Sequence, residues 1–237
     1  MIRVLVARGS GVAGQQVRLL EGEEHHLRVR RADAGEPVEV RDGEGLTGHG
    51  RLCRQGKGWC IEVTDAGRAA RPAELTLAVG AGDRDRFEWV VEKATELGVT
   101  SVIPLETDRT GGVASRVRPQ HLDRLRRQAL EAVKQSGAAW ATRVEKPLSL
   151  EDLAARPLAG QGWVAEASGG AVPAVVETAP LTVVVGPEGG LTAAELERLQ
   201  GAGYAPIRLG PYTLRFETAA ILAAAAAVAG RLRGGDG

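Results

Sequence analysis

The sequence predicts an α/β fold with a mainly parallel sheet, preceded by a smaller β-rich domain. From Glu74 onward, apolar runs alternate with helical patterns, which is typical of a parallel sheet covered by helices. Before residue 67, short strand patterns follow one another between glycine-bearing turns, which is typical of a small barrel. A length of 237 residues fits one large domain or two modest ones.

The first domain is expected over residues 1–66. Its five strand candidates are apolar segments between turn-forming residues, and they cover residues 2–7, 16–20, 37–40, 48–53 and 59–63. Between the second and third, residues 25–31 predict a helical turn or short helix that carries Arg28 and Arg31. Arginine suits phosphate because its planar fork donates two hydrogen bonds at once, although a lone charged run is more often a solvated face.

Residues 67–73 contain Pro72 and are expected to form a linker into a second domain, residues 74–237. The elements expected first in that domain alternate between strand and helix: strand 74–79, helix 83–97, strand 99–105, helix 119–135 and strand 163–165. A polar loop with Arg109 and Arg116 separates the second strand from the second helix.

The stretch 181–228 then contains two strand-to-loop-to-helix transitions. The apolar run Leu181–Val185 breaks at Gly186, and Thr192 with Glu195 forms a capping box that predicts a helix start. A strand over 206–209 similarly breaks at Gly210, and an apolar helix begins near Phe216. Loops at the carboxyl ends of parallel strands are where open α/β sheets bind ligands, so a ligand site is expected between these two loops.

Composition excludes several classes of protein. The 30 basic and 30 acidic side chains give no formal net charge, which argues against a globally basic nucleic-acid binder but not against local patches. The longest apolar run, residues 219–229, is shorter than the roughly 20 residues that a membrane span needs. No signal peptide is recognisable, so a soluble, cytoplasmic protein is expected. Cys53 and Cys60 lack the spacing of a metal site and are expected to be free thiols in a reducing cytosol.

The usual nucleotide motifs are absent from the sequence. It contains neither G-x-x-x-x-G-K-[ST] nor G-x-G-x-x-G after the first strand, which argues against an ATPase or a dinucleotide enzyme. It also lacks the G-x-S-x-G elbow of a hydrolase. The Gly-Pro-Glu-Gly-Gly loop at 186–190 has no lysine to hold a polyphosphate, which favours a ligand bound by backbone contacts and shape.

Five segments in a fixed order carry a more specific resemblance: 83–89 (DRDRFEW), 92–99 (EKATELGV), 134–137 (KQSG), 185–190 (VGPEGG) and 209–219 (LGPYTLRFETA). Together they resemble the RsmE family of SPOUT methyltransferases, which methylate N3 of a uracil in small-subunit ribosomal RNA. The resemblance extends over essentially the whole chain. One departure is Ala138, which stands where the family usually has arginine.

The resemblance implies a PUA-like β-barrel followed by a SPOUT domain with a trefoil knot, and a homodimer with the carboxyl-terminal helix near the interface. It implies that S-adenosylmethionine binds in the knot. The residues expected to hold this donor are Glu166, Val185, Gly186, Glu188, Gly190, Leu209, Gly210, Thr213 and Leu214.

The implied substrate is 16S ribosomal RNA in the assembled small subunit, at uracil-1498, with Arg28, Arg31, Arg109 and Arg116 as the expected RNA contacts. Uracil N3 becomes a good nucleophile only when its proton leaves. Arg215 is therefore expected to stabilise the uracil anion. Glu217 is expected to serve as the base, as a helix cap or as a partner of Arg215. A noncatalytic RNA-binding module of the same fold is the alternative, and no metal is expected.

Overall fold

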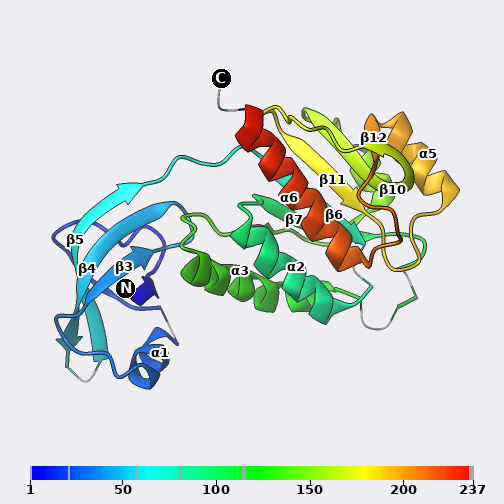
Figure 1. Cartoon of the computed structure of the whole chain (residues 1–237). Helices are drawn as coiled ribbons and strands as arrows, with labels where there is room; N and C mark the ends of the chain where they lie inside the picture. Colours follow the sequence, from blue (N-terminus) through cyan, green and yellow to red (C-terminus); the bar gives the residue numbers. More distant parts are fainter. Residues whose placement is uncertain are drawn as a thin grey trace. The chain divides into compact units, whose positions relative to one another are not determined.

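The computed structural model describes residues 2–20, 22–56, 58–80, 82–110, 112–113 and 116–234. The chain forms two compact units (Figure 1). The first unit comprises Met1–Arg71 together with Leu130–Ala141, and the second comprises Pro72–Ala129 and Thr142–Gly237.

The first unit contains a five-stranded sheet in the order β1-β3-β4-β5-β2, in which β1 and β3 are parallel and the other pairs antiparallel. Its elements are β1 (Ile2–Leu5), β2 (Gln16–Arg18), α1 (Glu23–Val29), β3 (Pro37–Arg41), β4 (Leu46–Gln55) and β5 (Gly58–Arg68). An isolated antiparallel bridge between Val6 and Leu19 links the ends of the two edge strands. All five predicted strands are present, and β5 runs two residues into the segment expected as a linker.

The prediction of free thiols at Cys53 and Cys60 was wrong, because the two residues form a disulfide. They pair directly across the antiparallel strands β4 and β5, with their Cα atoms 4.9 Å apart. Facing residues of an antiparallel pair lie within the distance that a disulfide spans. Gln55 pairs with Gly58 in the same register. The sequence Gly56-Lys57-Gly58 near the midpoint between the two cysteines was the available signal for this pairing.

The segment Leu130–Ala141 belongs to the first unit, although the sequence predicts it within the second domain. Backbone hydrogen bonds join it to the turn after β3: Gly45 N–H donates to Ala139 O at 2.8 Å, and Ala141 N–H to Gly43 O at 2.8 Å. Gly45 has φ of +103°, and a Cβ there would lie 2.5 Å from the Trp140 ring, so this contact requires glycine.

A buried ion pair adds to the same attachment. The Nζ of Lys134 lies 2.7 Å from Oε1 of Glu23, and both side chains are less than one-tenth exposed. Burial disfavours the charged ammonium, but hydrogen bonds with Glu131 and Glu23 outweigh burial and raise the pKa of Lys134 above its usual 10.5. A raised folded-state pKa means that this stabilisation is complete below pH 10.5 and is lost only as pH rises through the folded value.

The second unit is an α/β layer structure with a parallel sheet, as predicted. The strand order is β12-β10-β11-β6-β7-β8, with β9 also pairing with β7, and every pair is parallel. The strands are β6 (Leu75–Gly80), β7 (Ser101–Glu106), β8 (Arg143–Val144), β9 (Leu148–Ser149), β10 (Gln161–Ala171), β11 (Leu181–Val185) and β12 (Tyr204–Arg208). The helices are α2 (Arg84–Glu96), the 3-10 turn η1 (Pro119–His121), α3 (Leu122–Ser136), α4 (Leu150–Ala155), α5 (Ala193–Gly201) and α6 (Phe216–Gly234). Only the first part of α3, up to Ala129, belongs to this unit.

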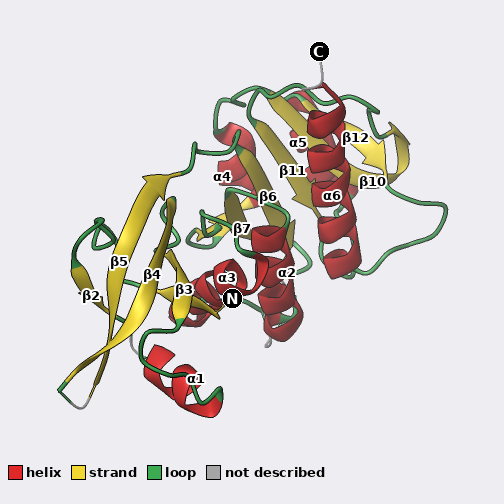
Figure 2. Ribbon diagram, turned by 60° about the vertical axis from the view of Figure 1, so that its left-hand side comes forward, coloured by secondary structure: helices red, strands yellow, loops and turns green. Residues whose placement is uncertain are grey.

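Helices cover both faces of this sheet (Figure 2). On one face, Leu150 and Leu153 of α4 and Leu199 of α5 pack against strand residues such as Val164 and Val184. On the other face, α6 packs against β6, β11 and α2. Successive strand residues point to opposite faces, so strands covered on both sides are continuously apolar, as Leu181–Val185 is.

Several predicted element boundaries in the second unit are confirmed. Asp83 caps α2, because its carboxylate accepts the backbone N–H groups of Asp85 and Arg86. Thr192 and Glu195 form the predicted capping box of α5, and α6 begins at Phe216. The sequence did not predict α4, β8 and β9, since each is too short to show a period.

Within the described residues, no helix has the length and apolar character needed to cross a membrane.

Removing one partner of the buried Lys134–Glu23 pair tests its role in the first unit. We expect Lys134→Ala to lower the free energy of unfolding by about 3 kcal/mol, because it leaves the Glu23 carboxylate buried without its cation. Lys146 is exposed, so Lys146→Ala is the matched control and is expected to have little effect. Chemical denaturation measures both. An equal effect of the two substitutions would contradict the structural role of the pair.

Candidate functional site

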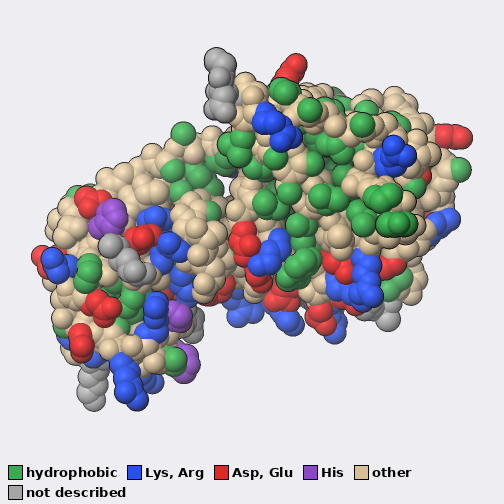
Figure 3. All heavy atoms as spheres, viewed as in Figure 1, with side chains coloured by type: hydrophobic (Ala, Val, Ile, Leu, Met, Phe, Trp, Pro, Cys, Tyr) green, Lys and Arg blue, Asp and Glu red, His purple; other side chains and the backbone are tan. Residues whose placement is uncertain are grey.

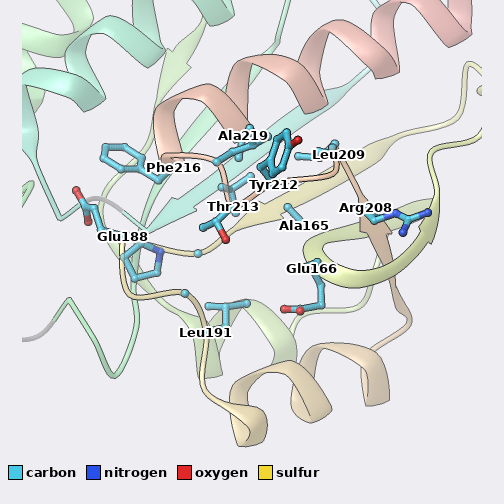
Figure 4. Close-up of a pocket in the computed structure, with 17 residues that line it drawn as sticks. Ala165, Glu166, Glu188, Leu191, Arg208, Leu209, Tyr212, Thr213, Phe216 and Ala219 are labelled. Atoms are coloured by element: carbon cyan, nitrogen blue, oxygen red, sulfur yellow. The ribbon is translucent and has the colours of Figure 1, made fainter.

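A cavity of about 210 Å³ lies at the carboxyl ends of β10, β11 and β12 (Figure 4). Its lining residues come from three segments: 165–167 in β10, 185–191 at the end of β11 and in the loop after it, and parts of 208–219 from the end of β12 into α6. These strands are parallel and adjacent in the sheet, so the loops that follow them meet at one edge.

The structure brings the nine residues expected to hold the donor together in this one cavity. They come from all three segments: Glu166, Val185, Gly186, Glu188, Gly190, Leu209, Gly210, Thr213 and Leu214. Three further lining residues also lie in the segments expected to border the site: Ala165, Pro187 and Tyr212. The sequence did not single out Ala167, Leu191, Arg208, Phe216 and Ala219. These are chain neighbours of the predicted residues, which was the only available signal for them.

The loop after β11 depends on close backbone contacts. A Cβ on Gly186 would lie 3.1 Å from the Cγ and the N of Leu191, and the N–H of Gly190 donates to Pro187 O at 2.7 Å. Gly190 has φ of +73°, a conformation that favours glycine. At the end of β6, a Cβ on Gly80 would lie 2.5 Å from the N of Pro187. Glycine at these positions lets the loop fold tightly against the sheet edge.

An irregular section of β10 supplies the second wall. Ala165 and Gly170 both pair with Ile207 of β12, so residues 166–169 leave the ladder between them. A Cβ on Gly169 would lie 2.6 Å from the N of Ile207, and glycine therefore permits this bulge to pack on β12. The bulge presents Glu166 to the cavity, on the same side as Leu191 (Figure 4).

The charged groups of the cavity wall are two carboxylates and one guanidinium, from Glu166, Glu188 and Arg208. Apolar side chains such as Leu191, Leu209 and Leu214 form much of the remaining surface. No lysine is among the described residues that line the cavity. Such a wall suits a ligand with an apolar ring system and positive charge.

Arg109 lies against the loop after β11, where its Nη1 donates to the carbonyl of Gly189. Glu195 holds Asp108, the residue before Arg109, in place. Its Oε1 accepts the backbone N–H of Asp108 at 2.9 Å, while its Oε2 accepts the N–H of Thr192 at 2.8 Å. The buried capping carboxylate of α5 thus connects the loop after β7 with the loop after β11.

The two residues expected to take part in the reaction flank the cavity without lining it. Arg215 is exposed, directly before α6, and no ion pair or hydrogen bond engages its guanidinium among the described residues. Glu217 is buried in the first turn of α6, and its Oε1 lies 3.5 Å from Nη1 of Arg86. Its Oε2 is buried without a hydrogen-bond partner in the described part of the chain. The ion partner of Glu217 is therefore Arg86 and not Arg215.

The expected RNA contacts are distributed over both units. Arg28 and Arg31 are exposed in the first unit, where they line a surface depression with Arg54 and Trp59. Arg109 and Arg116 belong to the second unit, and Arg116 is half-buried before the 3-10 turn. The described residues contain no cluster of histidine, cysteine or acidic side chains suited to a metal ion.

Comparison with known proteins gives consistent matches over most of the chain. The RNA methyltransferase domain family matches residues 69–228. The ribosomal RNA small subunit methyltransferase E of Aquifex aeolicus is 31% identical over 214 residues, which cover 88% of this chain and 92% of that protein. The protein of the same name from Bacillus subtilis is 31% identical over 225 residues, 87% of this chain and 88% of the relative.

Solved structures agree with the sequence matches. The small subunit methyltransferase E of Neisseria gonorrhoeae, bound to S-adenosylmethionine, superimposes with a TM-score of 0.83 at 26% identity and covers 95% of this chain and 96% of that one. A Legionella pneumophila protein assigned as a methyltransferase, also with bound S-adenosylmethionine, has a TM-score of 0.80 at 25% identity, covering 94% and 95%.

Adding a methyl group at Gly80 tests the close contact between the end of β6 and Pro187 in the loop after β11. We expect Gly80→Ala to lower the free energy of unfolding by about 1–3 kcal/mol, because its Cβ would overlap the Pro187 backbone. A Cβ added at Gly201, at the end of α5, would meet no neighbouring atom within 4 Å. Gly201→Ala is therefore the matched control and is expected to be neutral or slightly stabilising. Denaturant unfolding compares the two, and equal stability of both variants would show that the contact is not tight.

Proposed function

The chain belongs to the ribosomal RNA small subunit methyltransferase E family, and from that premise we propose that it methylates N3 of a uracil in 16S ribosomal RNA. The methyl donor is S-adenosylmethionine, and the proposed target is uracil-1498 in the assembled small subunit. Such a substrate implies a cytoplasmic site of action. The observation that carries the proposal is the cavity, which is lined by all nine residues that the family resemblance implies for the donor.

The cavity fits the donor chemically. An adenine ring needs apolar walls and backbone hydrogen-bonding groups, which Leu209, Leu214 and the loop of residues 186–190 can provide. The α-amino group and the sulfonium of the donor are cationic, and Glu166 and Glu188 supply complementary carboxylates. When bound, the donor supplies an electrophilic methyl group on sulfur.

The target base requires help from the protein, because uracil N3 carries a proton. We assign Arg215 to the stabilisation of negative charge on the uracil oxygens, since its exposed guanidinium is not held by another described residue. Glu217 is the proposed proton acceptor, because its Oε2 has no hydrogen-bond partner among the described residues. The N3–H bond breaks as the N3–methyl bond forms and the sulfur–methyl bond breaks. Arg109 is a proposed RNA contact, and its guanidinium donates a hydrogen bond to Gly189 O in the loop after β11.

The family resemblance also supports three structural proposals: a PUA-like barrel in the first unit, a trefoil knot around the donor cavity and a homodimer. The apolar character of α6 supports the last of these. Leu222 is 40% exposed and Leu232 is 69% exposed on this helix. Hydrophobic side chains gather over α6 in the space-filling view (Figure 3). Burial of this surface against a second copy would remove it from water.

Sedimentation velocity at micromolar concentration tests the homodimer. We expect the wild type to sediment as a dimer and Leu222→Glu to shift it towards monomer, because a charge cannot be buried there without a partner. Val12 is also an exposed apolar residue but lies in the first unit, so Val12→Glu is the control. A wild type that stays monomeric throughout this range would contradict the dimer.

Methyl transfer from labelled donor to small subunits that lack the modification tests the proposed activity. We expect Arg215→Ala to bind donor nearly as wild type does and to lose about 10²–10³-fold in kcat, the effect of removing one group that stabilises developing charge. Arg198 forms only an exposed ion pair with Glu151, so Arg198→Ala is the charge-matched control. Transfer by Arg215→Ala at a wild-type rate would exclude the proposed role, and wild type that binds no donor would contradict the function.

A further inference from the structure

The first unit has a surface depression between α1 and the β4–β5 hairpin that the methyl-transfer site does not use. Two adjoining hollows form it, and both include Glu24 and Trp59. The depression is lined by four arginines: Arg18, Arg28, Arg31 and Arg54. Glu24 is the only carboxylate among its described lining residues, and Oε1 of that group accepts the backbone N–H of Trp59 at 3.1 Å. Its net charge is therefore positive, which suits a phosphate-bearing ligand.

A stacked pair forms part of this surface. The guanidinium of Arg54 lies 3.5 Å from the ring centroid of Trp59. Trp59 is only 8% exposed, whereas Arg54 is exposed, so the tryptophan supports one face of the guanidinium and leaves the other outward. Guanidinium planes stack on nucleobases as well as on aromatic rings. Arg54 is thus held flat in the orientation that a base can stack on.

The backbone of Arg31 has a conformation that is unusual for a residue other than glycine. The end of α1 is a Schellman motif, in which Ala32 N–H donates to Leu27 O at 3.0 Å and Arg31 N–H to Arg28 O at 3.1 Å. This motif places one residue in the left-handed region, where glycine is strongly favoured. Arg31 occupies that position with φ of +54° and is the only described non-glycine residue with positive φ. An arginine in place of glycine costs conformational energy and adds a guanidinium to the depression.

We propose that this depression is a nucleotide-binding site for single-stranded RNA, in which a base stacks on Arg54 and the neighbouring phosphates bind Arg28 and Arg31. The proposal rests on the proposed function, because it assigns the depression to nucleotides of the substrate RNA other than the methylated one. The stacking of Arg54 on Trp59 favours RNA over an acidic peptide, since a peptide carboxylate needs the positive charges but not a planar surface on which a base can stack. Lys and Arg side chains lie near α1 on the face shown in Figure 3.

Fluorescence anisotropy with a labelled, short oligouridylate tests the site. We expect Arg54→Ala to weaken binding by about tenfold, the usual effect of losing one stacking platform. Arg51 lies on the same strand, but its guanidinium donates to Gly35 O and does not line the depression, so Arg51→Ala is the charge-matched control and should change affinity by less than about twofold. Arg54→Lys keeps the positive charge but lacks the planar guanidinium, so it should recover less than half of the affinity that Arg54→Ala loses. Equal affinities of Arg54→Ala and Arg51→Ala would overturn the proposal, as would full recovery by lysine.

Arg31→Gly separates RNA binding from folding. Glycine relieves the left-handed conformation, so the melting temperature should be unchanged or higher while affinity for the oligouridylate falls. Unchanged affinity would remove Arg31 from the site, and a lower melting temperature would give it a structural role instead.

Calorimetric titration of S-adenosylmethionine into the same proteins keeps this inference distinct from the proposed function. Donor binding should be the same in wild type, Arg54→Ala and Arg51→Ala. If donor binding and methyl transfer are normal but Arg54→Ala and Arg51→Ala bind RNA equally well, only the proposed RNA site in the depression is rejected. Absence of donor binding in wild type would reject the proposed function, and with it the RNA assignment that depends on it.

Discussion

The close approach of the loop after β11 to the end of β6 is the contact on which the candidate site depends. The Pro187 backbone occupies the space that a side chain at position 80 would fill, so the two strand ends can meet only with glycine there. This packing fixes the loop of residues 186–190 at the sheet edge, beside the loops of β10 and β12. Gly169 plays the corresponding role where the β10 bulge packs on Ile207. The cavity is therefore formed by backbone segments that glycine allows to come together, with few side chains between them.

Charged groups connect this cavity to its surroundings. Glu195 completes the cap of α5 with one oxygen and accepts a hydrogen bond from Asp108 with the other, so the start of α5, the loop after β11 and the residue next to Arg109 are fixed together. In the first unit, Lys134 and Glu23 attach the end of α3 to the start of α1. Neither contact could be predicted from the sequence of the helix that contains Glu195 or Lys134, because each contact joins segments that are distant in sequence.

Local physical chemistry made much of the second unit predictable. The run Leu181–Val185, the capping box at Thr192 and the apolar helix from Phe216 each depend on neighbouring residues, and the structure contains all three. The predicted cavity residues followed from loops at adjacent strand ends and from the family resemblance. Tertiary contacts decided the rest. The bulge in β10, the pairing of Glu217 with Arg86, the Cys53–Cys60 disulfide and the attachment of Leu130–Ala141 all require partners that periodicity does not reveal.

We propose that the cavity between the three loops holds the methyl donor, and calorimetric titration of S-adenosylmethionine into wild type and Gly210→Val tests this location most directly. A Cβ at position 210 would meet only Leu214 Cδ1, at 4.0 Å, so the variant should fold normally while its side chain narrows the cavity. We expect wild type to bind one donor per chain and Gly210→Val to lose measurable binding without a change in its donor-free melting temperature. Equal donor affinity in the two proteins would contradict this location of the donor.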